Sequence, residues 1–291
     1  MKLSGTITAM VTPFATDGSV DYGRLQAIVE EQVAAGVEGI CAVGTTGESP
    51  TLDHAEHHKV IEKTIAFAQG KVKILAGTGA NSTAEAISLT KAVIAAGGAD
   101  ATLQVTPYYN KPNAEGIYRH FMTVADLGLP VVLYNVPGRT GREIPLDVVA
   151  RLARHPNVVA VKEAAGSVDR VSAIKNLCPG FTVLSGDDAL AVPMISVGAA
   201  GVISVASNVI PREMGDMVRA ALAGDFATAG RLHAKYYPLF RDLFIDANPV
   251  MVKEALALMG KLARVFRLPL CETSEKNLAR MRETLVQVGL L

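Results

Sequence analysis

Lys162 is the residue whose type and position most clearly indicate chemistry, because it ends a short run of apolar residues. Residues 158–161 are valine or alanine, and Glu163 follows the lysine. When such a strand delivers a lysine into a partly dry pocket, desolvation lowers its pKa and increases the fraction of free amine. A free amine can attack a ketone and form a Schiff base. A solvated lysine at a strand end is the alternative for this residue alone, so the rest of the chain must supply a pocket.

The turn Gly44-Thr45-Thr46-Gly47-Glu48 has the composition of an anion-binding site. Its glycines let the backbone approach a ligand closely, and backbone N–H groups together with two hydroxyls can fix a small carboxylate. A tight connection between a strand and a helix, capped by threonine, has the same composition. Taken in isolation, the turn leaves both interpretations open.

Tyr134 and Arg139 offer a proton carrier and a second ligand for an anion. Tyr134 ends another apolar run, where its phenol can pass a proton to or from a nearby amine. Arg139 lies five residues further on, in a loop that contains Pro137 and Gly138. A guanidinium there can hold a carboxylate through two hydrogen bonds. An ordinary aromatic at a strand end and a surface arginine are the alternatives.

Together, these residue types predict one class of reaction, which needs no external cofactor. A lysine amine condenses with a 2-keto acid to a Schiff base, the turn holds the carboxylate of the acid, and a phenol moves protons. The iminium then acts as an electron sink for an enamine, which attacks or releases an aldehyde.

A metal site is not expected. His54, His57 and His58 cluster on one predicted helix but lack the His-Glu-x-x-His pattern. Asp187 and Asp188 precede a helical run, where they more commonly cap the helix N-terminus. A phosphate site after the last two strands is also disfavoured, because no Gly-Gly pair opens a helix there.

Short apolar runs recur along the chain with the spacing of βα units, roughly 20 to 35 residues. Because they are apolar throughout rather than alternating, they fit a parallel sheet covered by helices. Eight such units in about 220 residues predict an α/β fold, a (β/α)₈ TIM barrel, with its chemistry at the C-terminal strand ends. A doubly wound sheet fits less well, since no Gly-x-Gly-x-x-Gly turn follows the first strand. The predicted strands are residues 7–11, 39–43, 73–76, 101–105, 131–134, 158–162, 182–184 and 201–204.

Helical patterns follow the predicted strands, and three more come after residue 223. The strand signal stops after Ala223, and no linker rich in Gly, Ser or Pro separates these last helices from the barrel. We therefore expect residues 1–224 to form the catalytic barrel domain and residues 225–291 to form a helical extension packed on it. The predicted helices are residues 22–35, 54–68, 83–95, 114–127, 212–223, 225–243, 249–259 and 273–288.

The composition argues against several classes of function. Basic and acidic residues number 28 each, which leaves no strong field for nucleic acid or an anionic membrane. Charges interrupt every apolar stretch before it reaches transmembrane length. Residues 1–14 lack the pattern of a signal peptide, and Cys41, Cys178 and Cys271 fit neither a disulfide framework nor a zinc site. We expect a cytoplasmic protein that binds neither nucleic acid nor membranes.

The order and spacing of these motifs resemble the family of pyruvate-dependent Schiff-base lyases and synthases, nearly from end to end. The resemblance is strongest to the members that condense pyruvate with L-aspartate 4-semialdehyde, in the first committed step towards diaminopimelate and lysine. The motifs that carry it are Gly44-Thr45-Thr46-Gly47-Glu48, Val105-Thr106-Pro107-Tyr108-Tyr109-Asn110, Tyr134-Asn135-Val136-Pro137, Arg139-Thr140, Lys162 and Leu184-Ser185-Gly186-Asp187-Asp188.

The resemblance implies four catalytic residues. Lys162 would form the Schiff base with pyruvate, and Tyr134 would donate and accept protons. Thr45 would link Tyr134 to Tyr109 in a hydroxyl relay. Tyr109 would enter from a neighbouring subunit, because members of the family are usually homotetramers built as dimers of dimers.

The resemblance also implies substrate-binding residues and an inhibitory site. Thr46 would hold the pyruvate carboxylate, Arg139 would bind the carboxylate of the aldehyde, and Gly186 and the backbone of Ile203 would face the substrates. Free lysine would inhibit by binding at a subunit interface. The matching positions for lysine are Ser49, His54, His57, Asn81, Glu85 and Tyr108.

Three other functions stay open on the sequence. A sialic-acid lyase or a sugar-acid aldolase would share Lys162 and Tyr134, but a polyol pocket would favour neutral groups where Arg139 stands. A barrel isomerase that depends on a metal or a phosphate would not use a Schiff base. A non-catalytic sensor of small molecules would leave the polar residues at the strand ends unexplained.

Overall fold

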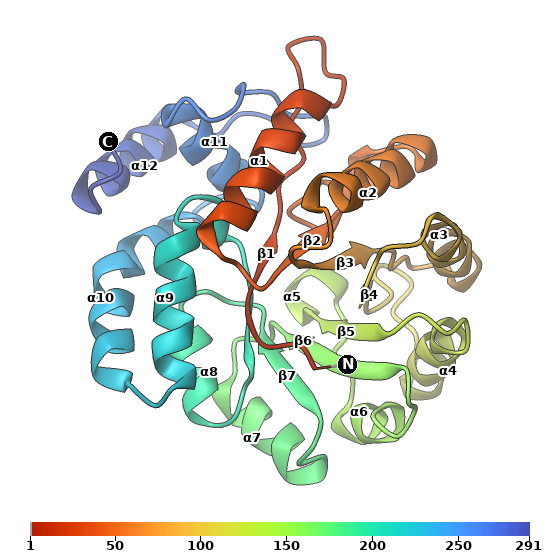
Figure 1. The fold of residues 1–291 in the computed structure, drawn as a ribbon. Coiled ribbons are helices and arrows are strands. Elements are labelled where there is room, and N and C mark those ends of the chain that lie inside the picture. Colours follow the sequence, from red (N-terminus) through yellow and green to blue (C-terminus); the bar gives the residue numbers. More distant parts are fainter. Residues whose placement is uncertain (1) are drawn as a thin grey trace.

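Eight parallel strands form a closed barrel within residues 2–291, the part of the chain that the computed structural model describes. Each strand pairs with the next in chain order, and β1 closes the ring by pairing with β8 (Figure 1). The predicted (β/α)₈ barrel is therefore confirmed. Met1, with which the predicted N-terminal segment 1–14 begins, lies outside the described residues. The strands are β1 (Gly5–Ala9), β2 (Gly39–Ala42), β3 (Lys73–Gly77), β4 (Ala101–Val105), β5 (Val131–Asn135), β6 (Val158–Glu163), β7 (Thr182–Ser185) and β8 (Gly201–Ser204).

Helices alternate with the strands and form an outer ring around the barrel (Figure 1). Helices α1 and α2 begin and end at the predicted residues, and each starts with an aspartate N-cap, Asp21 and Asp53. Helices α5, α6 and α7 were not among the predicted ranges, and for α8 only a helical run after Asp188 was expected. The ring contains α1 (Tyr22–Ala35), α2 (His54–Ala68), α3 (Thr83–Ala96), α4 (Ala114–Ala125), α5 (Pro137–Thr140), α6 (Leu146–Leu152), α7 (Val168–Leu177), α8 (Ala191–Ser196) and α9 (Pro211–Leu222), with 3₁₀ turns η1 (Ser49–Thr51) and η2 (Ala206–Asn208).

Strand β1 begins and ends two residues before the predicted run 7–11. At its first residue, Gly5 pairs with Gly201 of β8. Beyond its last residue, the backbone N–H of Val11 donates to the side chain of Asn208 at 3.1 Å instead of extending the ladder. A side chain nearly 200 residues away in the sequence (197) therefore helps to end the strand, which no pattern within the strand could indicate.

Apolar side chains fill two layers, one inside the barrel and one between the strands and the helices. Because both faces of each strand are covered, the strands are buried almost throughout and mostly apolar, as the prediction assumed. The exceptions include Thr8 in β1 and Gln104 in β4, which are polar but fully buried. The inner layer consists of Leu3, Ile7, Ala9, Cys41, Leu75, Ala101, Leu103, Val132, Tyr134, Val136, Ala160, Leu184 and Ile203. Two predicted site residues, Tyr134 and Ile203, thus belong to the inner layer.

Three C-terminal helices come after the barrel: α10 (Phe226–Asp242), α11 (Val250–Leu258) and α12 (Glu275–Gln287). Helix α10 packs on α8 and α9, while α11 contacts η2 and α12 (Figure 1). The buried carboxylate of Asp242 accepts hydrogen bonds from Arg280 at 2.9 Å and Thr284 at 2.6 Å, which joins α10 to α12. Across residues 2–291, every helix is too short or too polar to span a bilayer.

Candidate active site

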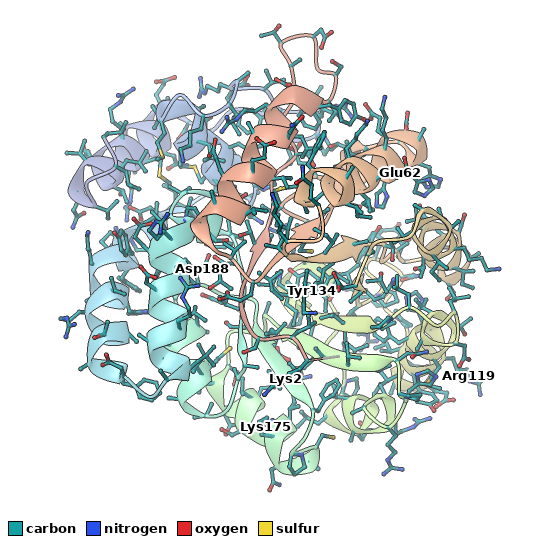
Figure 2. All side chains as sticks on the ribbon, in the orientation of Figure 1. Lys2, Glu62, Arg119, Tyr134, Lys175 and Asp188 are labelled. Carbon is teal, nitrogen blue, oxygen red and sulfur yellow. The ribbon has the colours of Figure 1, made fainter. Side chains whose placement is uncertain are left out.

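Tyr134 and Lys162 are the second-to-last residues of the neighbouring strands β5 and β6 and lie beside each other inside the barrel. Strands β5 and β6 pair in parallel, with Tyr134 in register with Lys162. The Lys162 amine lies 4.3 Å from the centre of the Tyr134 ring, and the two residues are only 5 % and 6 % exposed. Figure 2 shows Tyr134 within the ring of strands. The lysine and the phenol are therefore close enough for a ligand on one to contact the other.

The surroundings of Lys162 are closely packed and low in charge. The next residue, Glu163, is engaged in an ion pair with Arg170 rather than with the lysine. Burial raises the pKa of the nearby Cys41 thiol to about 11, which keeps that thiol neutral. A β-carbon at Gly186 would lie 3.0 Å from Cε of Lys162, so a larger residue there would displace the lysine.

A cavity of about 290 Å³ opens beside Tyr134 at the C-terminal ends of the strands. It brings together residues from the turn after β2, the ends of β3 and β4, and the segment after β5. Its lining consists of Val43, Gly44, Thr45, Ser49, Pro50, Gly77, Gly79, Leu103, Val105, Tyr108, Tyr134, Arg139 and Thr140. One hollow therefore contains the expected relay hydroxyl, the phenol and the guanidinium.

The turn at residues 44–48 has strained backbone on both sides. Val43 has φ 54° and Glu48 has φ 56°, a left-handed conformation that is unusual for any non-glycine residue and most unusual for a β-branched one. The surrounding backbone encloses this turn, because a β-carbon at Gly77 would overlap the carbonyl oxygen of Val43. Thr12 adds a hydrogen bond of 2.6 Å to the carbonyl of Gly47. Close backbone packing thus holds the turn in a conformation that is costly on its own.

Two residues near and within α11 complete the support of this turn. Asn248 donates from Nδ2 to the Thr46 hydroxyl oxygen at 3.0 Å, and its carbonyl accepts from Arg139 at 3.2 Å. The Lys253 amine pairs with Glu48 at 2.6 Å, with both side chains fully buried. Burial lowers the pKa of Lys253, and the carboxylate of Glu48 opposes that shift. The C-terminal part of the chain therefore contributes directly to the site.

The residues expected to bind free lysine occupy the outer side of the same region. His54 contacts Glu85 at 3.0 Å, and Ser49 and Tyr108 line the cavity. His57 is buried, and burial lowers its pKa to about 4, which keeps the ring neutral. The remaining member is Asn81, whose carbonyl accepts from Asn110 at 2.8 Å.

Tyr109 does not line the cavity of its own chain. It is 89 % exposed and has φ 71°, so a strained backbone presents an aromatic ring to the exterior.

Within residues 2–291, no three His, Cys, Asp or Glu side chains form a group that could hold a metal ion.

A model of the dihydrodipicolinate synthetase family matches residues 2–288. The chain belongs to this family. It is 50 % identical over 291 residues to the 4-hydroxy-tetrahydrodipicolinate synthase of Alcanivorax borkumensis, covering 99 % of each chain. It is 48 % identical over 285 residues to the enzyme of Methanospirillum hungatei JF-1, covering 97 % of this chain and 98 % of that one.

Solved structures of the family have the same fold. The chloride-inhibited dihydrodipicolinate synthase of Acinetobacter baumannii, complexed with pyruvate, superposes with a TM-score of 0.98 over the full length of both chains at 44 % identity. The family resemblance inferred from the motifs is therefore confirmed.

The motifs located most of the site but not its supports. Strand-end positions identified Thr45, Tyr134 and Arg139, which share the cavity. Asn248 and Lys253 were missed, because the C-terminal helices were expected only to pack on the barrel. A signal was present for Lys253, which stands with Glu254 inside an otherwise apolar run at residues 250–258. Charged residues within such a run are rarely buried unless they are paired.

Proposed function

We infer that the protein catalyses the reaction for which its relatives are named, the condensation of pyruvate with L-aspartate 4-semialdehyde to 4-hydroxy-tetrahydrodipicolinate. This is the first committed step of diaminopimelate and lysine biosynthesis. The observation that carries the inference is the buried amine of Lys162 beside the Tyr134 phenol, on paired strand ends of a chain from this family. A cytoplasmic location is part of the proposal, since the pathway starts from central metabolites.

The chemistry rests on these two groups. The Lys162 amine adds to the keto carbon of pyruvate, and loss of water gives the Schiff base. Loss of a methyl proton gives the enamine, whose carbon attacks the aldehyde carbon of the second substrate to form the new C–C bond. The amino group of that substrate then displaces the lysine nitrogen, which closes the ring and regenerates the amine. Tyr134 is proposed to carry the protons in these steps.

Pyruvate is proposed to bind with its carboxylate at Thr46. The side chain of Asn248 donates to the oxygen of the Thr46 hydroxyl, so the hydroxyl proton is free to point at an anion. Gly186 and Ile203 complete the proposed pocket, because the first leaves room beside Lys162 and the second belongs to the inner layer of the barrel.

The second substrate is proposed to bind Arg139 through its carboxylate. Arg139 lines the cavity and carries the positive charge that an aldehyde with a carboxylate needs. This charge also separates the proposal from an aldolase for sugar acids or sialic acids, whose polyol would gain little from it. Assays with pyruvate and either aldehyde distinguish the two, and preference for a sugar aldehyde would contradict the proposal.

Association into a homotetramer, as a dimer of dimers, is proposed from the position of Tyr109. Its exposed ring does not line the cavity of its own chain, yet the proposed relay from Tyr134 through Thr45 needs it. Inhibition by free lysine is proposed for the set around His54 and Glu85, where a carboxylate can face an ammonium group. Unchanged activity in millimolar lysine would refute the inhibition.

Trapping of the covalent intermediate tests the proposed function most directly. The protein is incubated with pyruvate and borohydride, digested and analysed by mass spectrometry. We expect one adduct of the pyruvate skeleton, located at Lys162, and none in Lys162→Ala. Trapping without pyruvate dependence, or at another lysine, would refute the mechanism.

A further inference from the structure

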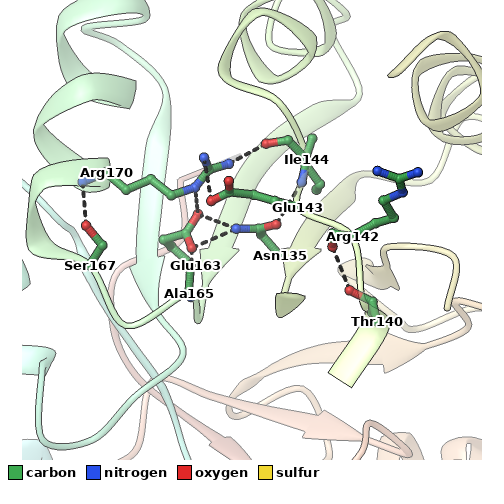
Figure 3. A network of polar contacts seen from close by, with 9 residues as sticks. All are labelled: Asn135, Thr140, Arg142, Glu143, Ile144, Glu163, Ala165, Ser167 and Arg170. Carbon is green, nitrogen blue, oxygen red and sulfur yellow. Dashed lines mark hydrogen bonds and ion pairs between the residues drawn. The ribbon is translucent and has the colours of Figure 1, made fainter. Parts of the chain in front are cut away.

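A buried polar network lies behind Tyr134 and Lys162, on the outer face of the barrel wall (Figure 3). Asn135 and Glu163 directly follow these two residues and are also in register with each other. Because successive side chains of a strand point to opposite faces, a pair that faces the inside is followed by a pair that faces the helices. Asn135 and Glu163 are both fully buried, so the catalytic pair has a polar pair immediately behind it.

The carboxylate of Glu163 has a complete set of partners. It accepts hydrogen bonds from Asn135 at 2.8 and 3.1 Å and from the backbone N–H of Ala165 at 2.9 Å. Arg170 of α7 donates to it at 2.8 Å. A buried ion pair requires such saturation, and a saturated network fixes its members rigidly.

The network also holds both backbone groups of Ile144. The N–H of Ile144 donates to Oδ1 of Asn135 at 2.9 Å, and its carbonyl accepts from Nη2 of Arg170. Figure 3 shows the Arg170 guanidinium between Glu163 and the segment at residues 143–144. Ile144 is therefore fixed to the ends of β5 and β6 by residues from two different elements.

Ile144 ends the segment that carries Arg139. This segment leaves β5 at Val136, makes the four-residue turn α5 and exposes residues 141–143, so few of its side chains are buried. Its other hydrogen bonds give less support. One is local, from the Thr140 hydroxyl to the carbonyl of Arg142 at 2.7 Å, and another is a single bond from Arg139 to the carbonyl of Asn248. The Ile144 attachment thus fixes the far end of the segment.

We propose that Asn135, Glu163 and Arg170 are positioning residues for the second substrate, because they set Arg139 at a fixed place relative to Lys162. This inference rests on the proposed function, in which Arg139 binds the carboxylate of aspartate 4-semialdehyde. The network does not touch the turn at residues 44–48. Disturbing it should therefore weaken binding of the aldehyde and leave formation of the pyruvate Schiff base intact.

Arg170→Lys tests the proposal while retaining the charge. A lysine head group cannot bond Glu163 and the Ile144 carbonyl in the fork geometry of a guanidinium. We expect KM for aspartate 4-semialdehyde to rise roughly 10- to 100-fold, the effect of a displacement of about 1 Å. KM for pyruvate and the borohydride trapping rate should stay within about two-fold of wild type, since no residue of the turn moves.

Glu143→Gln is the matched control. Glu143 pairs with the same guanidinium at 2.8 Å, but its side chain is 48 % exposed and does not hold Ile144. An exposed ion-pair partner of this kind contributes little to the position of Arg170, so KM for pyruvate and KM for aspartate 4-semialdehyde should both stay within about two-fold of wild type.

Asn135→Ser provides a second test in case Arg170→Lys does not fold. It releases the N–H of Ile144 and leaves the ion pair of Glu163 with Arg170 in place. As for Arg170→Lys, we expect KM for aspartate 4-semialdehyde to rise and KM for pyruvate to stay unchanged. Variants that melt like wild type but show unchanged KM values, or a parallel rise in both, would overturn the proposal. Absence of pyruvate trapping in the wild type would instead refute the proposed function, so the two failures are distinguishable.

Discussion

The two regions of the cavity that are proposed to bind carboxylates are held in place by different means. The turn at residues 44–48 is fixed by close backbone packing, with strained residues at Val43 and Glu48 and glycine contacts that admit no β-carbon, and by the buried ion pair of Glu48 with Lys253. The segment at residues 136–144 is fixed by side chains, through Asn135, Arg170 and Asn248.

This difference matters for substrate specificity. Neither the close backbone packing of the turn nor its buried ion pair can be altered by a single exchange without destabilising the barrel, so the proposed site for the first substrate is difficult to change. Side-chain attachments can be exchanged one at a time, so the position of Arg139 can be adjusted. If the proposed roles hold, such a barrel would retain its keto acid more readily than its aldehyde when side chains are exchanged.

A comparison of the stabilities of Gly77→Ala and Gly138→Ala tests this contrast, and it should give the largest effect. A β-carbon at Gly77 would overlap the Val43 carbonyl and lie 2.9 Å from the Gly44 nitrogen, whereas at Gly138 it would meet nothing within 4 Å. We expect Gly77→Ala to lose more than about 3 kcal/mol of unfolding free energy, or to yield no folded protein. Gly138→Ala should melt like wild type. Equal melting temperatures for the two variants would contradict the contrast.

Glu48→Gln should have the next largest effect, because it leaves the buried Lys253 amine without a negative partner. We expect a loss of about 3–5 kcal/mol in unfolding free energy, together with weaker pyruvate binding. Urea denaturation and KM for pyruvate measure the two consequences. The double variant Glu48→Gln/Lys253→Met removes both charges and should recover most of the stability. If the single variant is as stable as wild type, the ion pair does not support the turn.

Asp188→Asn should change stability without affecting either region. Burial raises the pKa of Asp188 to about 6, above its ordinary 3.8. Between pH 4 and 6 the unfolded chain has lost this proton and the folded chain retains it, so unfolding free energy falls as pH rises. Wild type should lose about 3 kcal/mol relative to the variant across this window. His57, which burial keeps neutral, is present in both proteins and cancels; a difference that does not vary with pH would contradict the assignment.

Arg139→Lys should have the smallest effect and act only on the second substrate. A lysine at this position retains the charge but loses the paired hydrogen bonds to a carboxylate. We expect KM for aspartate 4-semialdehyde to rise roughly tenfold, or about 1–2 kcal/mol, with pyruvate trapping unchanged. Steady-state kinetics with each substrate varied in turn decides the matter. A rise in KM for pyruvate alone would contradict the proposal and would indicate that Arg139 binds pyruvate instead of the aldehyde.

The sequence predicted those features that depend on local pattern. Apolar runs without alternation indicated a parallel barrel, and polar residues after those runs located Thr45, Tyr134 and Arg139 at one rim. Helices α1 and α2 were predicted to the residue, and α10, which also has an aspartate cap, to within one residue at each end.

The supports of the site depend on contacts between distant residues, and no local pattern reports these. Asn248 meets Thr46 across 202 positions, and Lys253 meets Glu48 across 205. Ile144 is held through its backbone N–H and carbonyl, which every residue except proline has, so its residue type could not indicate this contact. His57 lies on the buried side of α2 together with Val60 and Ile61, and its part in lysine binding stays a prediction.

The partnership between Glu48 and Lys253 also sets the order in which a new chain can become active. The ribosome completes the turn at residues 44–48 early, yet the amine that neutralises Glu48 is synthesised 205 residues later. Until α11 has emerged and docked, a nascent chain that closes around this glutamate would enclose an uncompensated negative charge. Catalytic competence is therefore among the last properties that the growing chain acquires, and a prematurely terminated product would lack it.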